Sequence, residues 1–480
     1  MKSPSWLEGI ANRAILTNAS ALAASRAVTS ILGVLYWSFA ARQFPPSAVG
    51  FAAASIAAMT LLATVGVLGV GTLLMNEIPR RPGEERSLIS AAMLVAAAGG
   101  AGLGALFAIL AHYASADFEP LATGWQSGGL FALGVSLTAI TLVLDSALIG
   151  WLRGGLQLKR NAVFAATKLA ALVLMGTWLA GRDGLTIYAT WAVGNLVSLI
   201  GLAGPEAWSR TRLCTYRPRW GVLREMGRAA LAHHVLNLAL QAPPLTLSLV
   251  VTGLLSATTN AYFYTAWMVA SFLFVGPIAL ATAFQPVGAG APSTVAHRLR
   301  FALAASLLVS LVGCLVLLVS ADWLLDIFGH AYAQQAGWSL RILGLGIFPL
   351  IVKEHYVVVC RISGRMALAT VAVAAGGLLE VGLAAAGAVV GGLPGLSVGW
   401  VIGVCVQALL MAPTVYDAAA DRRSAGLPSN PPWRMLAGPT NAVLSAGTGR
   451  SADHVPEQRI SPRDTYSSSA EHLDAGHGAT

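Results

Sequence analysis

Long apolar runs and short polar connections alternate along most of the chain. A run of about 20 apolar residues crosses a bilayer as a helix, because a helix satisfies its own backbone hydrogen bonds inside lipid. The pattern predicts twelve spans, at residues 14–41, 48–75, 88–114, 125–152, 161–181, 185–204, 226–251, 258–285, 301–320, 338–360, 366–390 and 395–416. We therefore predict an all-α polytopic membrane protein with twelve transmembrane helices.

The positive charges of the connections alternate in step with the predicted spans. The connections on one side hold fifteen Lys and Arg residues, whereas those on the other side hold only Arg42 and Arg182. Positively charged loops stay in the cytoplasm, so the first side is predicted to be cytoplasmic, with both termini facing it. A missed span would reverse the alternation beyond it, and the regular contrast therefore supports the number of spans.

The largest cytoplasmic connection divides the spans into six and six. We predict an N-terminal lobe at 1–204, a cytoplasmic linker at 205–225 and a C-terminal lobe at 226–418. Residues 419–480 are rich in Ser, Pro, Gly and His and have no apolar run long enough for a core. That composition predicts a disordered cytoplasmic tail.

A faint repeat relates the two predicted lobes. The stretch FPPSAVGFAAA at 44–54 resembles LSATTNAYFYTA at 255–266 when Gly50 is aligned with Ala261. Two copies with an even number of spans have the same orientation, which places a pseudo-twofold axis along the membrane normal. Chance similarity in an Ala-rich sequence is the alternative explanation.

Composition excludes several classes of protein. With 56% hydrophobic and 11% charged residues, the chain departs far from the usage of soluble domains, in which about 25% of residues are charged. The net charge of +9 comes from cations between apolar runs, where topology and lipid headgroups explain it, so nucleic acid is not an expected partner. The four cysteines are scattered singly, and we expect no disulfide framework, metal site or cofactor.

Two charges lie well inside predicted spans four and five. A charge at the centre of a membrane helix costs about 2.5–3.5 kcal/mol on insertion scales, so it normally faces a partner or a wet cavity. Asp145 and Lys168 lie at equal depth from the inner ends of the predicted spans, which allows an ion pair. Alternatively, Lys168 lines a path for an anion, with Arg153 and Arg160 at its mouth. Arg26, near the middle of span one, favours the anion path.

Other ionisable residues in the spans are candidates for ion pairing or for coupling to protons or cations. Glu77 ends span two, and Lys353, Glu354 and His355 follow one another in span ten. Glu380 in span eleven fits either coupling or a simple pair with a neighbour. Lys353 is also a candidate lumen cation of the second lobe.

Two features of the later spans concern helix geometry. Pro243 and Pro244 in span seven should bend that helix and make it a hinge. Gly395, Gly399 and Gly403 recur every four residues in span twelve, which is typical of close helix packing.

The sequence resembles the polysaccharide-type lipid-linked oligosaccharide flippases of the multidrug/oligosaccharidyl-lipid/polysaccharide exporter superfamily. The resemblance covers about residues 1–418, and its motifs are loose patterns. It depends on NASALAASRAVTSILGVLYWSFAARQFPPSAVGFAAA with Arg26 and Gly50, on NEIPRR at the end of span two, on the turn between spans four and five, and on the two-lobe layout.

The resemblance implies a V-shaped pair of six-helix lobes in a bacterial inner membrane. It also implies a cationic lumen for the pyrophosphate of an undecaprenyl-linked glycan, with Arg26 and Lys168 as lumen cations and Arg153 and Arg160 at the cytoplasmic entrance. A polysaccharide polymerase and a chain-length regulator would be partners of a monomeric transporter. The second lobe departs from this pattern, because it has few cations at mid-membrane besides Lys353.

The sequence therefore predicts a transporter and not an enzyme. The main hypothesis is a flippase for lipid-linked oligosaccharide repeat units that works by alternating access. A drug or cation antiporter of the same superfamily is the alternative, which should have a lumen dominated by acidic groups. A membrane glycan polymerase or ligase is the third hypothesis, but it normally needs a large outer loop with catalytic residues, and the sequence has no such loop.

Overall fold

The computed structural model describes residues 31–80, 83–151, 153–178, 183–202, 220–290 and 295–420, and every regular element in these ranges is helical. Eight of the helices in this part of the chain are long and apolar enough to cross a membrane, and α13 and α14 form a ninth candidate span that is bent by 42°. The predicted tail, most of the predicted linker and Arg26 lie outside the described residues. The number of twelve spans, the two lobes and the orientation stay predictions.

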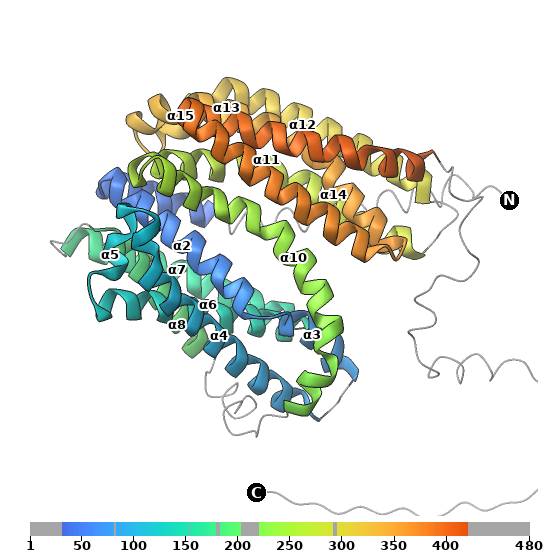
Figure 1. Cartoon of the computed structure of the whole chain (residues 1–480), viewed down its shortest axis with the longest axis horizontal. Helices are drawn as coiled ribbons and strands as arrows, with labels where there is room; N and C mark the ends of the chain where they lie inside the picture. The colour runs from blue at the N-terminus through green and yellow to red at the C-terminus, as the bar shows by residue number, and fades with distance from the viewer. Residues whose placement is uncertain are drawn as a thin grey trace, which may run out of the picture. The chain divides into compact units, whose positions relative to one another are not determined.

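The helices of the described residues correspond to the apolar runs of the sequence, and Figure 1 shows how they are arranged. Residues 31–43 are helical and precede the first labelled helix. The helices that follow in the first half are α2 (Pro46–Gly66), α3 (Val70–Glu77), α4 (Glu85–Ala114), α5 (Glu119–Ala122), α6 (Trp125–Gly150), α7 (Gly154–Trp178) and α8 (Gly184–Leu202). Those of the second half are α10 (Trp220–Leu254), α11 (Ala257–Gly290), α12 (Val295–Asp326), α13 (His330–Leu345), α14 (Ile347–Ile362) and α15 (Met366–Ala419).

One error in the predicted boundaries, at the start of span five, affects the candidate site. The predicted start at residue 161 is wrong, because α7 begins at Gly154. The stretch GGLQLKR is polar and glycine-rich, which is typical of a connection, but its residues are helical. This shift moves every later side chain of α7 about 10 Å along the helix relative to the prediction, at 1.5 Å per residue.

Predicted spans eleven and twelve form a hairpin within α15. The backbone leaves helical geometry at Gly391 and at Gly392, which has a φ of 60°, in the left-handed region that glycine adopts most readily. The two arms then pack closely: a Cβ at Gly399 would collide with the carbonyl oxygen of Leu383 and lie 2.7 Å from its carbonyl carbon. A Cβ at Gly403 would lie 2.7 Å from the Cα of Glu380. The prediction of close packing by this glycine ladder is confirmed.

Replacing Gly399 with leucine should therefore disrupt the hairpin. Inserting a side chain where backbone atoms already touch costs about 1–3 kcal/mol or more, and we expect the apparent melting temperature of the purified protein to fall by roughly 5–10 °C. Gly382→Leu on the same helix is the control, because no heavy atom lies within 4 Å of the Cβ position there. Equal melting temperatures of the two variants would contradict this packing.

Helices α2 and α11 meet at the two segments that the faint repeat aligned. A Cβ at Gly50 would collide with the carbonyl oxygen of Ala257 and lie 2.7 Å from the backbone nitrogen of Ala261. The side-chain amide of Asn260 donates a hydrogen bond of 2.8 Å to the carbonyl oxygen of Gly50. Gly50 thus lies against Ala261, the residue that the faint repeat aligned with it. We call this contact the α2–α11 seam.

Helix α10 contacts helices from both halves of the chain. It packs against α2 and α3 and also against α15, and Figure 1 shows it as one long curved helix. Pro243 and Pro244 lie inside it, and Pro243 faces Gly377 of α15, where a Cβ would lie 2.8 Å from the proline ring. The predicted role of the two prolines as a hinge stays a prediction.

Candidate functional site

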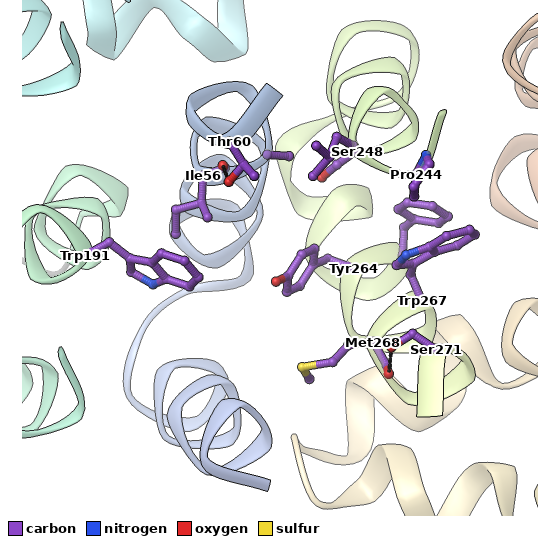
Figure 2. A pocket seen from close by; sticks show the side chains of 12 residues that line it. Ile56, Thr60, Trp191, Pro244, Ser248, Tyr264, Trp267, Met268 and Ser271 are labelled. Atoms are coloured by element: carbon purple, nitrogen blue, oxygen red, sulfur yellow. Dashed lines mark hydrogen bonds between the residues drawn. The ribbon is translucent and has the colours of Figure 1, made fainter. Parts of the chain in front are cut away.

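A cavity of about 230 Å³ lies between α2, α8, α10 and α11 (Figure 2), and its lining residues on α2 and α11 follow those of the α2–α11 seam along the chain. Figure 2 shows Trp191 of α8 and Ile56 of α2 on one side, facing Tyr264 and Met268 of α11 on the other. The residues that line it are Ile56, Ala57, Thr60, Trp191, Pro244, Leu245, Ser248, Phe263, Tyr264, Trp267, Met268 and Ser271. We call this cavity the aromatic pocket.

The aromatic pocket has no charged side chain in its lining. Its serine and threonine hydroxyls are occupied locally: Thr60 donates to the carbonyl oxygen of Ile56 at 2.8 Å, and Ser271 donates to that of Met268 at 2.7 Å. Ser248 donates to the side-chain oxygen of Asn260 at 2.8 Å. Large rings and a flexible methionine therefore provide most of the contact surface, which suits apolar or aromatic ligands.

A second layer of aromatic rings holds the pocket wall in place. The ring centroids of Trp37 and Tyr264 are 4.7 Å apart, and those of Trp267 and Trp400 are 4.9 Å apart. Trp37 and Trp400 are each only 2% exposed. The rings that a ligand would touch are therefore fixed by buried neighbours, and the pocket is largely preformed.

Lys168 lies next to the aromatic pocket, inside a cage of three aromatic rings. Its ammonium lies 3.8 Å from the ring centroid of Trp191 and 4.8 Å from those of Tyr36 and Phe164. The residue is 6% exposed, and Gly194 of α8 allows its close approach, since a Cβ there would lie 3.1 Å from that of Lys168. Within the described part of the chain, this ammonium contacts rings and pairs with no carboxylate.

The predicted ion pair between Asp145 and Lys168 is wrong. Arg160 binds both oxygens of Asp145, from Nε at 2.8 Å and from Nη2 at 2.6 Å. Because α7 begins at Gly154, Arg160 lies about 9 Å along that helix, near the depth of Asp145, whereas Lys168 lies about 21 Å along it. The prediction placed the start of the helix too late and therefore paired the wrong cation.

The two cations predicted at the cytoplasmic entrance differ in their surroundings. Arg153 is exposed, and its guanidinium lies 5.8 Å from the ring centroid of Trp151. Arg160 is 5% exposed and is held by Asp145. Arg153 is thus accessible to a ligand, whereas the charge of Arg160 is already compensated.

A second buried ion pair joins α14 and α15. The ammonium of Lys353 donates to Glu380 at 2.6 Å, and both residues are less than 5% exposed. The indole nitrogen of Trp400 donates to the other carboxylate oxygen of Glu380 at 3.3 Å. The structure therefore places Glu380 in the simple pair that the sequence left open beside ion coupling, and it gives Lys353 a carboxylate partner inside the protein.

The remaining candidates lie apart from the aromatic pocket's lining. Glu77 forms an ion pair with Arg80 at 3.2 Å at the end of α3. His355 is fully buried on α14, with Nδ1 2.8 Å from the carbonyl oxygen of Ile351, and Glu354 beside it is half-buried. Among the described residues, no group of three or more His, Cys, Asp or Glu side chains could hold a metal ion.

The sequence did not predict the residues of the aromatic pocket. Tyr264, Trp267, Met268 and Ser271 are spaced as one face of a helix, but aromatic and small residues are common on helices that face lipid. Only the packing of α11 against α2 and α10 turns this face inward.

Known proteins resemble this chain in part of the sequence and in the fold. The MatE family model matches residues 235–385, and no curated protein sequence matches the chain. An inward-facing multidrug resistance MATE family transporter of the MOP superfamily is similar in structure, with a TM-score of 0.65 and 14% identity over 83% of this chain and 96% of that chain.

Two further solved structures are also similar. An outward-facing MATE family transporter has a TM-score of 0.59 and 15% identity, over 86% of this chain and 96% of its own. A MOP superfamily transporter from Pyrococcus furiosus Vc1 (DSM3638), described as having a binding pocket of reverse polarity that suggests a different function, has a TM-score of 0.58 and 15% identity, over 85% and 96%. These relatives are transporters, in agreement with the predicted class. The chain is thus a multi-pass membrane protein whose fold is that of MATE family transporters, and residues 235–385 of it match the MatE family model.

Proposed function

We propose that the chain exports amphiphilic organic compounds by alternating access, as a transporter of the multidrug type. The aromatic pocket is the single observation that carries this proposal, because a preformed, uncharged cavity of rings and methionine suits apolar bodies of varied shape. The comparisons favour this drug antiporter over the oligosaccharide flippase that was the main hypothesis from the sequence. The acidic lumen expected for such an antiporter is not a feature of this pocket, whose lining is uncharged.

The proposed transport needs no covalent chemistry. A compound enters the aromatic pocket from the side away from the α2–α11 seam and gains free energy by burying apolar surface. Opening of the seam and closure of the other side then expose the pocket to the opposite face of the membrane. The two states exchange populations because the compound, or a coupling ion, contacts them differently.

Replacement of Trp267 by alanine tests the role of the pocket. The variant loses a large ring in the wall, and we expect the KM for export of ethidium or tetraphenylphosphonium from proteoliposomes to rise by about tenfold, with less change in kcat. Trp323→Ala is the matched control, because this tryptophan of α12 is 71% exposed and does not line the pocket. Unchanged export by the Trp267 variant would argue against binding in this pocket.

Lys168 favours a second candidate, a flippase for lipid-linked oligosaccharides. A buried ammonium that lacks a carboxylate among the described residues could bind a pyrophosphate, and Arg26 and Arg153 would add charge along the path. The polymerase and chain-length regulator would be partners only in this case. Deletion of the gene, with complementation by Lys168→Ala, distinguishes the candidates: loss of surface polysaccharide with accumulation of lipid-linked glycan in the inner leaflet would favour the flippase.

A further inference from the structure

The cage around Lys168 has the composition of a receptor for organic cations. Aromatic cages bind quaternary ammonium groups through the negative faces of their rings. Here three rings, from Tyr36, Phe164 and Trp191, surround an ammonium that belongs to the protein itself. Trp191 belongs both to this cage and to the lining of the aromatic pocket.

Lys168 differs from the other buried cations of the described residues. Arg160 and Lys353 each bind a carboxylate at 2.6 Å, so their charges are compensated. In the ranges that the structure describes, the groups that face the Lys168 ammonium are three aromatic rings. Lys168 can therefore become neutral when another cation binds nearby, and no carboxylate is then left unpaired.

A cationic ligand at Trp191 would be close to Lys168. A cation bound to an indole lies within about 6 Å of the ring centroid, so it would lie within about 10 Å of the ammonium, which is 3.8 Å from that centroid. At that separation, and with an effective dielectric constant of about 20, repulsion between two unit charges weakens binding by about tenfold or more.

We propose, on the basis of the proposed function, that the proton on Lys168 and an organic cation in the aromatic pocket exclude each other. When the cation binds, the Lys168 ammonium gives up one proton to the water on the side to which the pocket is open, and the neutral amine remains in the cage. When the cation leaves on the opposite side, the amine takes up one proton from that side. One positive charge then moves in each direction, so Lys168 couples export to proton entry.

In the described part of the chain, the ionisable side chains on the helices that pack against α7 have partners of their own. On α6, Asp145, which lies at a different depth from Lys168, is held by Arg160. The Tyr36 hydroxyl, from the helix at residues 31–43, lies 2.7 Å from Thr190 Oγ1, and the Tyr188 hydroxyl on α8 donates to the carbonyl oxygen of Phe131 at 2.9 Å. These groups make Lys168 the clearest candidate for the exchanged proton in this part of the structure.

Two probes of the same shape and opposite charge test the proposal. Purified full-length protein in nanodiscs is titrated with tetraphenylphosphonium or tetraphenylborate at pH 6 to 9, and proton release is measured by calorimetry in buffers of different ionisation enthalpy. For the natural protein we expect the Kd of the phosphonium to fall by about tenfold as the pH rises, with release of about one proton at the lower pH values. The Kd of the borate should change in the opposite direction.

Two substitutions at one position separate charge from packing. In Lys168→Met the charge is absent, and the phosphonium should bind tightly at every pH without proton release. In Lys168→Arg the charge is permanent, because arginine does not lose its proton in proteins, and binding should be weak at every pH. A Met variant that keeps the pH dependence and proton release of the natural protein, or an Arg variant that binds the phosphonium as the natural protein does, would overturn the proposal.

The two probes also distinguish failure of this inference from failure of the proposed function. Suppose that both probes bind and that Trp267→Ala weakens the binding of both, but that the Lys168 variants do not change the pH dependence. Binding in the aromatic pocket is then supported, and proton exchange at Lys168 is overturned. If only the borate binds, and only when Lys168 is present, the exchange is overturned in favour of an anionic substrate. If neither binds, the proposed function is lost together with the exchange.

Discussion

Replacing Gly50 with leucine is expected to reduce transport by at least about tenfold while the protein still folds. The Cβ position at Gly50 is occupied by the carbonyl oxygen of Ala257, and the amide nitrogen of Ala261 is 2.7 Å from it. A leucine side chain at this position would overlap the backbone of α11. The two helices would have to separate to make room for it, so the α2–α11 seam could not close. The state with the seam open is not affected, so the populations shift strongly towards it. Export from proteoliposomes measures the effect.

The matched control for Gly50 is Gly102→Leu on α4, where no heavy atom lies within 4 Å of the Cβ position. Both variants should elute as monodisperse protein, and only Gly50→Leu should lose transport.

A cysteine that replaces Ser271, in a variant whose natural cysteines have been removed, reports on access to the aromatic pocket. Membrane-impermeant maleimide added from the side of the seam should label it faster in the Gly50 variant. Equal labelling rates, with normal export, would contradict a closed seam.

Breaking the pair between Lys353 and Glu380 should cause the largest loss of stability among single changes of charge. Both side chains are at least 95% buried, and removal of one partner leaves a buried charge uncompensated, which costs about 3–5 kcal/mol. We expect Lys353→Met to lower the melting temperature by roughly 10 °C. The double variant Lys353→Met with Glu380→Leu should recover most of this loss, because no charge remains unpaired. Thermal unfolding of the purified variants measures both effects.

An exposed ion pair gives the comparison for this experiment. Arg341 binds Asp322 through two hydrogen bonds of 3.0 and 2.9 Å, but the side chain of Asp322 is 63% exposed. Such pairs contribute about 0–1 kcal/mol, so Arg341→Met should change the melting temperature little. A double variant of Lys353 and Glu380 as unstable as the single variant would show that packing, and not the unpaired charge, dominates at this site.

The errors of the sequence analysis have a common physical cause. The polar and glycine-rich start of α7 is typical of a connection, but a helix end that need not lie in lipid can be polar. The resulting shift moved Lys168 to the depth of Asp145 and away from the rings that surround it. The depth of a side chain depends on where its helix begins, and that boundary is the least certain part of a prediction from apolar runs.

The comparison of the two glycine sites shows what kinds of packing can be predicted. Gly395, Gly399 and Gly403 recur at helical spacing, and their close approach to the preceding arm follows from sequence because the two arms are adjacent in the chain. Gly50 lies against residues more than 200 positions later. The faint repeat aligned it with Ala261, but a repeat alone does not say that the aligned segments touch.

The sequence by itself determined that this chain is an all-helical, multi-pass membrane protein, because apolar runs act locally along the chain and the bilayer imposes them on every span. Only the tertiary structure decided which buried charges meet, that Arg160 and not Lys168 holds Asp145, and that Trp191, Tyr264 and Trp267 form one pocket beside a caged ammonium. Those contacts join helices far apart in the chain, and their geometry depends on helix rotation and depth, which no local pattern of hydrophobicity specifies.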